Sequence, residues 1–258
     1  MSSYLRPPSD EELVVIDSIL KKVLDGATLA DDDTAFKIDS ALVLRFLRQN
    51  DGKEEKTLKA ILECIEWRKT TKPYLITFDS VKEWAQEGVS RCAGFTKIGV
   101  PICQVRPVSG LKVDIEMRVN YVRWMYEELM RRGYYEIVFI GDFSQVSSAP
   151  TSDEKRCRDQ IDEMRAKYYP LFETQLYFVA MPWILRAVFA VIVAFMSGAQ
   201  KEAMHTGLKP KHLLEWIDAS QLHENLEGTL PVLKTKNDSG VEVPDVLAMF
   251  PQPRTQQQ

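Results

Sequence analysis

The sequence predicts an α/β domain in which a mixed, mostly parallel sheet is flanked by helices and preceded by a helical lobe. Three observations support this prediction. Apolar residues recur at helical spacing between residues 10 and 88. Segments typical of strands and helices alternate between residues 89 and 230, as they do in sheets with a parallel core. A run at 176–196 contains a single charged residue, Arg186.

Composition narrows the class of protein. Hydrophobic residues make up 45% of the 258 residues, enough for one large domain or for a large and a small one. The net charge of −4 gives no basic field, so we expect no nucleic acid partner. The polar start of the chain has no signal-peptide pattern, which favours a cytoplasmic location and reduced cysteines. Cys64 and Cys92 are expected to be core residues, with a disulfide as the alternative.

The N-terminal lobe is predicted to be helical over residues 10–88, after a short polar leader at 1–9. Asp10 is the expected N-cap of the first helix. The second helix carries Arg45 and Arg48 on its polar side, where they face solvent or contact acidic headgroups. The helices are expected over residues 10–26, 40–50 and 53–70.

The α/β lobe is predicted over residues 89–230. Residues 135–140 have the sequence YEIVFI, and such a continuous apolar strand is typical of a sheet covered on both faces. The tail at 231–258 contains four prolines and ends in three glutamines, so we expect it to be flexible, either mostly disordered or loosely docked. Further strands are expected at 92–95, 101–106, 176–180 and 201–206, and helices at 114–132, 152–169 and 210–216.

The run at 176–196 has three interpretations. Its 21 residues suit a membrane span, a buried strand and helix, or a strand followed by an apolar gate helix. Pro182 divides the run, because proline is disfavoured inside a helix and favoured in its first turn. We therefore expect a strand up to residue 180 and a helix at 183–196, which we call the gate segment. It is apolar on nearly every face, so it must be buried, lie in lipid or cover an apolar ligand.

The sequence lacks the common catalytic motifs. It has no GxSxG turn, no GxGxxG and no GxxxxGK[ST], so the nucleophile elbow and the phosphate-binding loops are missing. His205, His212 and His223 share no metal-ligand spacing, and we expect no metal site. Asp142 follows an apolar strand and is interpreted as a strand-end residue, with a catalytic acid as the alternative. We predict that the chain is not an enzyme.

Several segments resemble one family of lipid-binding domains. The segments LVLRFLRQND and KAILECIEWRK are similar to the N-terminal signature of the CRAL-TRIO (Sec14-like) family. KYYP at 167–170 and LYFVAMPWILRAVF at 176–189 follow in that family's order. The segment Met181-Pro182-Trp183 with the gate segment resembles, more narrowly, the subfamily of motile sperm domain-containing proteins.

This resemblance implies the CRAL-TRIO fold, with a hydrophobic cavity closed by a gate helix. It implies non-enzymatic binding, and intermembrane transfer, of one lipid or lipophilic molecule. That lipid would be the ligand in place of any cofactor, membrane contact would be transient and peripheral, and a monomer is the favoured state. The phosphatidylinositol signature of the family is not matched. Leu171 stands where that signature has glutamate, and Ala203 where it has lysine, with Lys201 two residues out of register.

The candidate lipid-binding residues come from the gate segment, two strands and one side wall. Strand alternation selects every second strand residue, while the choice of the cavity-facing set follows from the resemblance. An alternative is a scaffold or regulatory domain whose cavity is filled by its own side chains, such as Trp183, Phe178, Phe189 and Phe195. The candidates are Ile137, Phe139, Ile161, Met164, Leu171, Leu176, Phe178, Val188, Phe189, Ile192 and Phe195.

Overall fold

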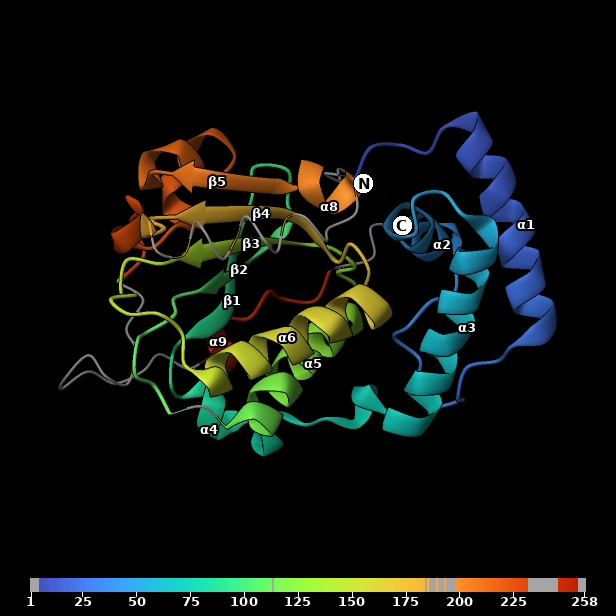
Figure 1. Cartoon of the computed structure of the whole chain (residues 1–258), viewed down its shortest axis with the longest axis horizontal. Helices are drawn as coiled ribbons and strands as arrows, with labels where there is room; N and C mark the ends of the chain where they lie inside the picture. Colours follow the sequence, from blue (N-terminus) through green and yellow to red (C-terminus); the bar gives the residue numbers. More distant parts are fainter. Residues whose placement is uncertain are drawn as a thin grey trace.

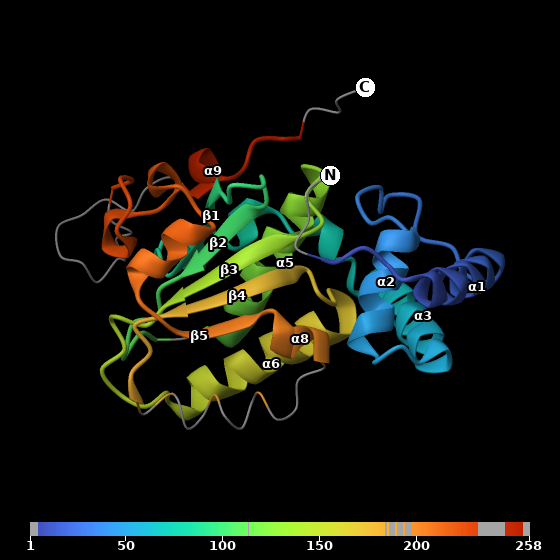
Figure 2. The ribbon, with the colours of Figure 1, turned by 90° about the horizontal axis from the view of Figure 1, so that it is seen from above.

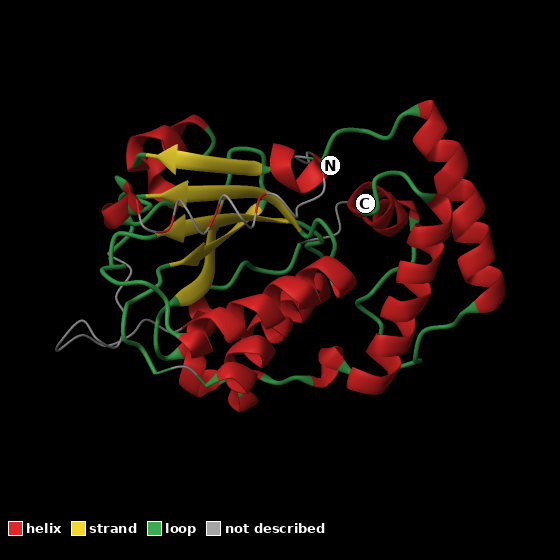
Figure 3. Cartoon of the chain, in the orientation of Figure 1, coloured by secondary structure: helices red, strands yellow, loops and turns green. Residues whose placement is uncertain are grey.

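The computed structural model describes residues 5–112, 114–183, 185, 189, 193, 198–231 and 246–254. Its helical N-terminal lobe lies beside an α/β lobe, as Figure 1 shows. Figure 3 makes the division visible, because all strands belong to one lobe. The predicted α/β class is confirmed.

The N-terminal lobe is built from α1 (Asp10–Gly26), α2 (Ser40–Gln49) and α3 (Glu54–Thr71). These bounds agree with the predicted helices. The N-cap of α1 is Ser9 rather than Asp10, since the Ser9 hydroxyl accepts a hydrogen bond from the Glu12 N–H and the Glu12 carboxylate accepts one from the Ser9 N–H. The Asp39 carboxylate caps α2 at 2.8 Å from the Leu42 N–H.

The expectation for Arg45 and Arg48 is wrong in both of its forms, because both side chains are buried. Arg48 forms a two-pronged ion pair with Glu12, with N–O distances of 2.9 Å, and also donates to the Arg6 carbonyl. Arg45 donates to the Tyr135 carbonyl at 2.9 Å. These arginines therefore join α2 to α1 and to the α/β lobe.

The sheet has five strands in the order β1-β2-β3-β4-β5. The pairing of β1 with β2 is antiparallel and the other three pairings are parallel, which confirms the predicted mixed sheet. The strands are β1 (Ser90–Phe95), β2 (Pro101–Val105), β3 (Ile137–Asp142), β4 (Glu173–Val179) and β5 (Met204–Leu208). Because β4 ends before Pro182, the run at 176–196 is not one membrane-spanning helix.

Helices cover both faces of the sheet, as the view in Figure 2 shows. Two long helices, α5 (Ile115–Arg131) and α6 (Ser152–Tyr168), lie on one face. Ile102, Val138 and Tyr177 face the opposite side, in a core with the segment 210–226. The short helices are η1 (Pro73–Leu75), η2 (Phe78–Ser80), α4 (Lys82–Ala85), α8 (Gly198–Glu202), η3 (Pro210–Glu215), η4 (Ala219–Gln221), η5 (Glu224–Leu226) and α9 (Val246–Met249).

A buried cluster of charges joins the two lobes. Arg68 of α3 donates to both oxygens of Asp33, at 2.6 and 2.9 Å, and to both oxygens of Glu127 on α5, at 2.8 Å each. The Tyr169 hydroxyl also donates to Glu127, at 2.6 Å. All four side chains are buried. Such a cluster is stable only while every member is present, since a lone buried charge costs several kcal/mol.

Two expectations need correction. Cys92 and Cys103, which lie opposite each other on β1 and β2, form a disulfide, so these two thiols are not free. Cys64 and Cys157 are free and buried. The tail is also more firmly packed than expected at 246–254, where Phe250 is buried against Trp124 at a ring distance of 5.4 Å. A proline-rich composition concealed these few apolar anchors.

Candidate functional site

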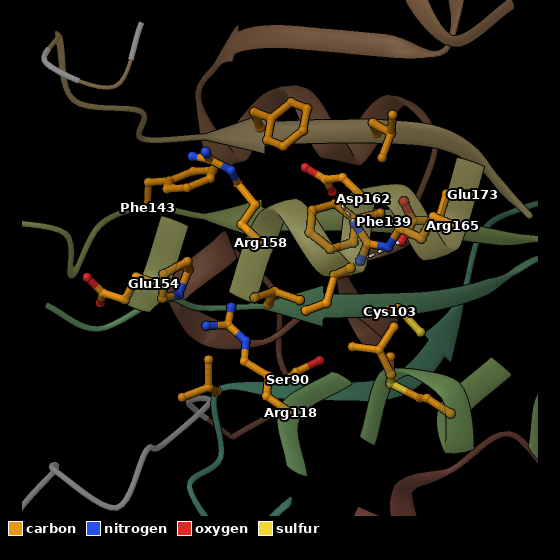
Figure 4. Close-up of a pocket in the computed structure, with 18 of the residues that line it drawn as sticks. Ser90, Cys103, Arg118, Phe139, Phe143, Glu154, Arg158, Asp162, Arg165 and Glu173 are labelled. Atoms are coloured by element: carbon orange, nitrogen blue, oxygen red, sulfur yellow. Dashed lines mark ion pairs between the residues drawn. The ribbon is translucent and has the colours of Figure 1, made fainter. Parts of the chain in front are cut away.

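A cavity of about 450 Å³ lies between the sheet and the two long helices. Its floor is formed by β3 and β4, and its walls by α5 and α6 (Figure 4). This volume falls within the range of about 300–1,000 Å³ that is common for small-molecule sites. The cavity is therefore the candidate ligand site of the chain.

Six of the eleven candidate residues line this cavity: Phe139, Ile161, Leu171, Leu176, Phe178 and Phe189. Ile137 and Met164 are buried in the core outside the lining. Ile137 begins β3 beneath the helices, and Met164 lies on the side of α6 that packs into that core. Val188, Ile192 and Phe195 lie outside the described residues.

An aromatic cluster occupies one part of the cavity. Phe178 on β4 lies 6.0 Å from Phe139, 6.0 Å from Phe143 and 4.8 Å from Phe189, measured between ring centroids. Gly141 makes this convergence possible, because a Cβ there would come within 2.9 Å of the Phe143 ring and 3.1 Å of the Phe178 ring. These rings give the cavity an apolar surface.

The described residues of the gate segment flank this cluster. Leu185 is buried and Phe189 is half-buried, and both line the cavity from helical positions. Trp183 behaves differently, because 80% of its side chain is exposed to solvent. The gate segment thus places apolar groups both toward the cavity and toward the outside.

The polar part of the lining was missed by sequence analysis. It includes Arg118 from α5 and, from α6, Glu154, Arg158, Asp162 and Arg165. The α6 residues recur at intervals of three to four, which puts them on one face of the helix. That spacing was visible in the sequence, but charges on a helix ordinarily mark the solvent face, so it gave no signal for a cavity.

Arg165 belongs to a network that satisfies its charge. It lies 3.1 Å from Glu173 and donates to the Tyr126 hydroxyl at 2.9 Å, while that hydroxyl donates to Glu173 at 2.6 Å. Burial works against the charged form of Arg165, but the neighbouring Glu173 carboxylate raises its pKa above the ordinary value. Burial, with Glu173 beside it, raises the pKa of Tyr126. The polar groups of these three side chains are therefore paired with one another at the side of the cavity.

Backbone strain occurs beside the cavity and at the end of the domain. Leu171 lines the cavity with φ of +48°, in the left-handed region that non-glycine residues rarely adopt. Glu227 also lies in this region, with φ of +62°. The next residue is Gly228, where a Cβ would lie 1.9 Å from the Leu222 carbonyl oxygen. Only glycine fits at position 228, because the chain approaches Leu222 so closely there.

Asp142 is held by contacts with neighbouring segments of the chain. It is buried at the end of β3, accepts hydrogen bonds from the Ser144 N–H at 3.0 Å and the Asn225 amide at 2.7 Å, and lies 3.6 Å from Arg106. The carboxylate thus joins the β3 loop to the segment around η5. This arrangement supports the strand-end interpretation over the catalytic one.

The described part of the chain shows neither a metal-binding cluster nor a membrane-spanning helix. No group of three or more His, Cys, Asp or Glu side chains there is arranged to hold a metal ion. Among the same residues, none of the helices combines the length and apolar character needed to cross a membrane.

Comparisons with known proteins agree with the fold. The chain is 23% identical to Patellin-6 of Arabidopsis thaliana over 207 residues, which cover 74% of this chain and 49% of that protein. The chain thus spans about half the length of this relative. The crystal structure of Sfh5 superposes with a TM-score of 0.58 at 16% identity, covering 78% of this chain and 81% of that one, so it shares the fold.

The decisive comparison is with the CRAL/TRIO domain, whose family profile matches residues 86–228, more than half of the chain. Domains of this family generally bind or transfer lipids and are generally non-enzymatic. The narrower resemblance to motile sperm domain-containing proteins stays a prediction. The predicted fold and the predicted family are confirmed: the chain belongs to the CRAL/TRIO domain family.

Proposed function

We propose that this chain binds a single lipid or lipophilic molecule in the cavity beneath the gate segment and carries it between membranes. The observation that carries the proposal is the 450 Å³ cavity, with its aromatic cluster on β3 and β4 and with Leu185 and Phe189 at its border. Each Å² of apolar ligand surface removed from water contributes about 25 cal/mol, so a long chain gains several kcal/mol.

We further propose that the gate segment opens at a membrane surface, in the cytoplasm, and that contact is transient. An opened cavity would expose a large apolar patch, which proteins normally reserve for a membrane or a partner. The exposed Trp183 supports this, because tryptophan is enriched where protein meets the interface of a bilayer. The monomer remains the favoured state.

The alternative is a scaffold whose cavity is filled by its own side chains. Phe178 and Phe189 do occupy part of the site, but Trp183 points to solvent and the described side chains leave 450 Å³. The remaining space favours a ligand over self-filling. The scaffold would act through protein or membrane contacts alone.

Native mass spectrometry of protein purified from cells tests the proposal. We expect an added mass of a few hundred daltons that is lost on denaturation and recovered by organic extraction. A bare chain mass that stays unchanged after incubation with mixed liposomes would contradict lipid binding and favour the scaffold.

Replacing Trp183 with alanine is expected to weaken association with vesicles by about tenfold, since a large aromatic group leaves the membrane contact. Lipid already in the cavity should remain bound, because Trp183 faces away from it. Vesicle co-flotation measures the effect. Leu24→Ala, at an exposed apolar residue of α1, is the matched control. Equal loss in both variants would remove the special role of Trp183.

A further inference from the structure

The charged side chains of the cavity fall into two groups with different partners. In Figure 4, Arg165 and Glu173 lie at one end, while Arg118, Arg158 and Glu154 lie toward the other. The first pair is satisfied by the network with Tyr126 described above, and Asp162 lies 3.5 Å from Arg165. The contacts of the second group are the ones that bear on the chemistry of a ligand head.

Arg118 lacks an acidic partner in the part of the chain that the structure describes, where no carboxylate oxygen lies within 4.0 Å of its nitrogens. Its guanidinium lies 5.2 Å from the centroid of the Trp84 ring and beside the Cys157 thiol. Burial lowers the pKa of Arg118, and the neighbouring Cys157, Glu154 and Asp162 offset this shift only in part. An anion placed against this guanidinium would remove the desolvation cost that its surroundings leave unbalanced.

Arg158 has only a weak tie to the protein. Its one ion pair among the described residues joins it to Asp159, at 2.9 Å, and 68% of the Asp159 side chain is exposed. Exposed ion pairs of this kind contribute about 0–1 kcal/mol to the stability of a protein. The Nε of Arg158 is buried and has no hydrogen-bond partner. The guanidinium therefore retains donors for a ligand that enters the cavity.

Glu154 does not neutralise these two arginines by direct pairing. Its carboxylate accepts a hydrogen bond from the Thr151 N–H at 2.6 Å and so serves as the capping box of α6. Arg118 and Arg158 thus provide two guanidinium groups at one end of a cavity that also contains the apolar aromatic cluster. Guanidinium groups bind carboxylate and phosphate oxygens through paired hydrogen bonds.

We infer that the ligand is an amphiphile with an anionic head, a carboxylate or a phosphate, which Arg118 and Arg158 hold while its apolar part lies against Phe139, Phe178 and Phe189. This inference rests on the proposed lipid-binding function and specifies the chemistry of the ligand. The site differs from the phosphatidylinositol signature, whose glutamate and lysine positions hold Leu171 and Ala203 here.

Two pairs of matched probes test the inference by equilibrium partition from cyclodextrin. Oleic acid is compared with oleyl alcohol, and dioleoyl phosphatidic acid with dioleoylglycerol. We expect the wild-type protein to bind the anionic member of at least one pair about tenfold or more tightly. Preference within the first pair identifies a carboxylate head, and preference within the second identifies a phosphate head.

Variants assign that preference to the two arginines. Arg118→Gln and Arg158→Gln should each reduce it at least several-fold, while Arg118→Lys should retain much of it. Arg156→Gln is the matched control, since Arg156 lies on the same helix with 65% of its side chain exposed. Equal binding of anionic and neutral probes would overturn this inference but not the proposed function. A preference that survives Arg118→Gln would do the same. Failure of all four probes to bind would overturn the proposed function as well.

Discussion

Replacing Arg68 with methionine is expected to lower the free energy of unfolding by about 3–5 kcal/mol. The substitution leaves Asp33 and Glu127 buried without the guanidinium that holds both of them. Two buried carboxylates that lose their common partner repel each other and cannot regain water. Urea denaturation followed by circular dichroism measures the change.

The matched control is Lys59→Met on the same helix. Lys59 pairs with Glu63 at 3.7 Å, but 78% of its side chain is exposed, so its loss should change stability by no more than about 0.5 kcal/mol. Arg68→Lys keeps the charge but not the planar guanidinium that binds two carboxylates, so we expect an intermediate loss of stability. A loss below about 1 kcal/mol for Arg68→Met would show that the cluster does not hold the two lobes together.

Replacing Phe189 with aspartate is expected to weaken lipid binding by about two orders of magnitude. The ring contributes to the aromatic cluster with Phe143 and Phe178, and a carboxylate in its place would face an apolar surface. Uptake of a neutral lipid from cyclodextrin measures the loss. Circular dichroism should show an unchanged fold, because Phe189 is only half-buried.

Trp183→Asp provides the comparison for this variant. It adds the same charge to the same segment, but at a side chain that is 80% exposed. We expect its lipid uptake from cyclodextrin to match that of the wild type. Unchanged uptake by Phe189→Asp would remove the gate segment from the binding site, and equal loss in both variants would point to a general effect of charge on the segment.

The periodicity of apolar residues and the order of the segments along the chain predicted most of the fold. Helical spacing located α1, α5 and α6 to within a few residues, and the apolar run in β3 indicated a sheet covered on both faces. These features are local, so the sequence displays them directly. The resemblance supplied the cavity-facing alternation, and Phe139, Leu176 and Phe178 do line the cavity.

Features that depend on distant partners could not be predicted. The local sequence places Arg48 on a solvent-facing side of its helix, but its partner Glu12 lies 36 positions away in the chain. Arg118 and Arg158 looked like charges on helix surfaces, because nothing local shows that α5 and α6 enclose a cavity. The pairing of Cys92 with Cys103 depends on the register of β1 and β2, which the spacing of the cysteines alone does not reveal.

The packing of residues 246–254 has a consequence for the edge of the sheet. β1 is an edge strand, and unpaired strand edges recruit other chains. Here the Gln221 side chain accepts from the Phe95 N–H at 3.0 Å, and Met249 of α9 contacts Arg91. During synthesis β1 emerges long before these covering residues, so its edge stays open until the end of the domain is made. Ribosome-bound chains, or chains shortened before residue 246, should therefore aggregate more readily than the folded domain.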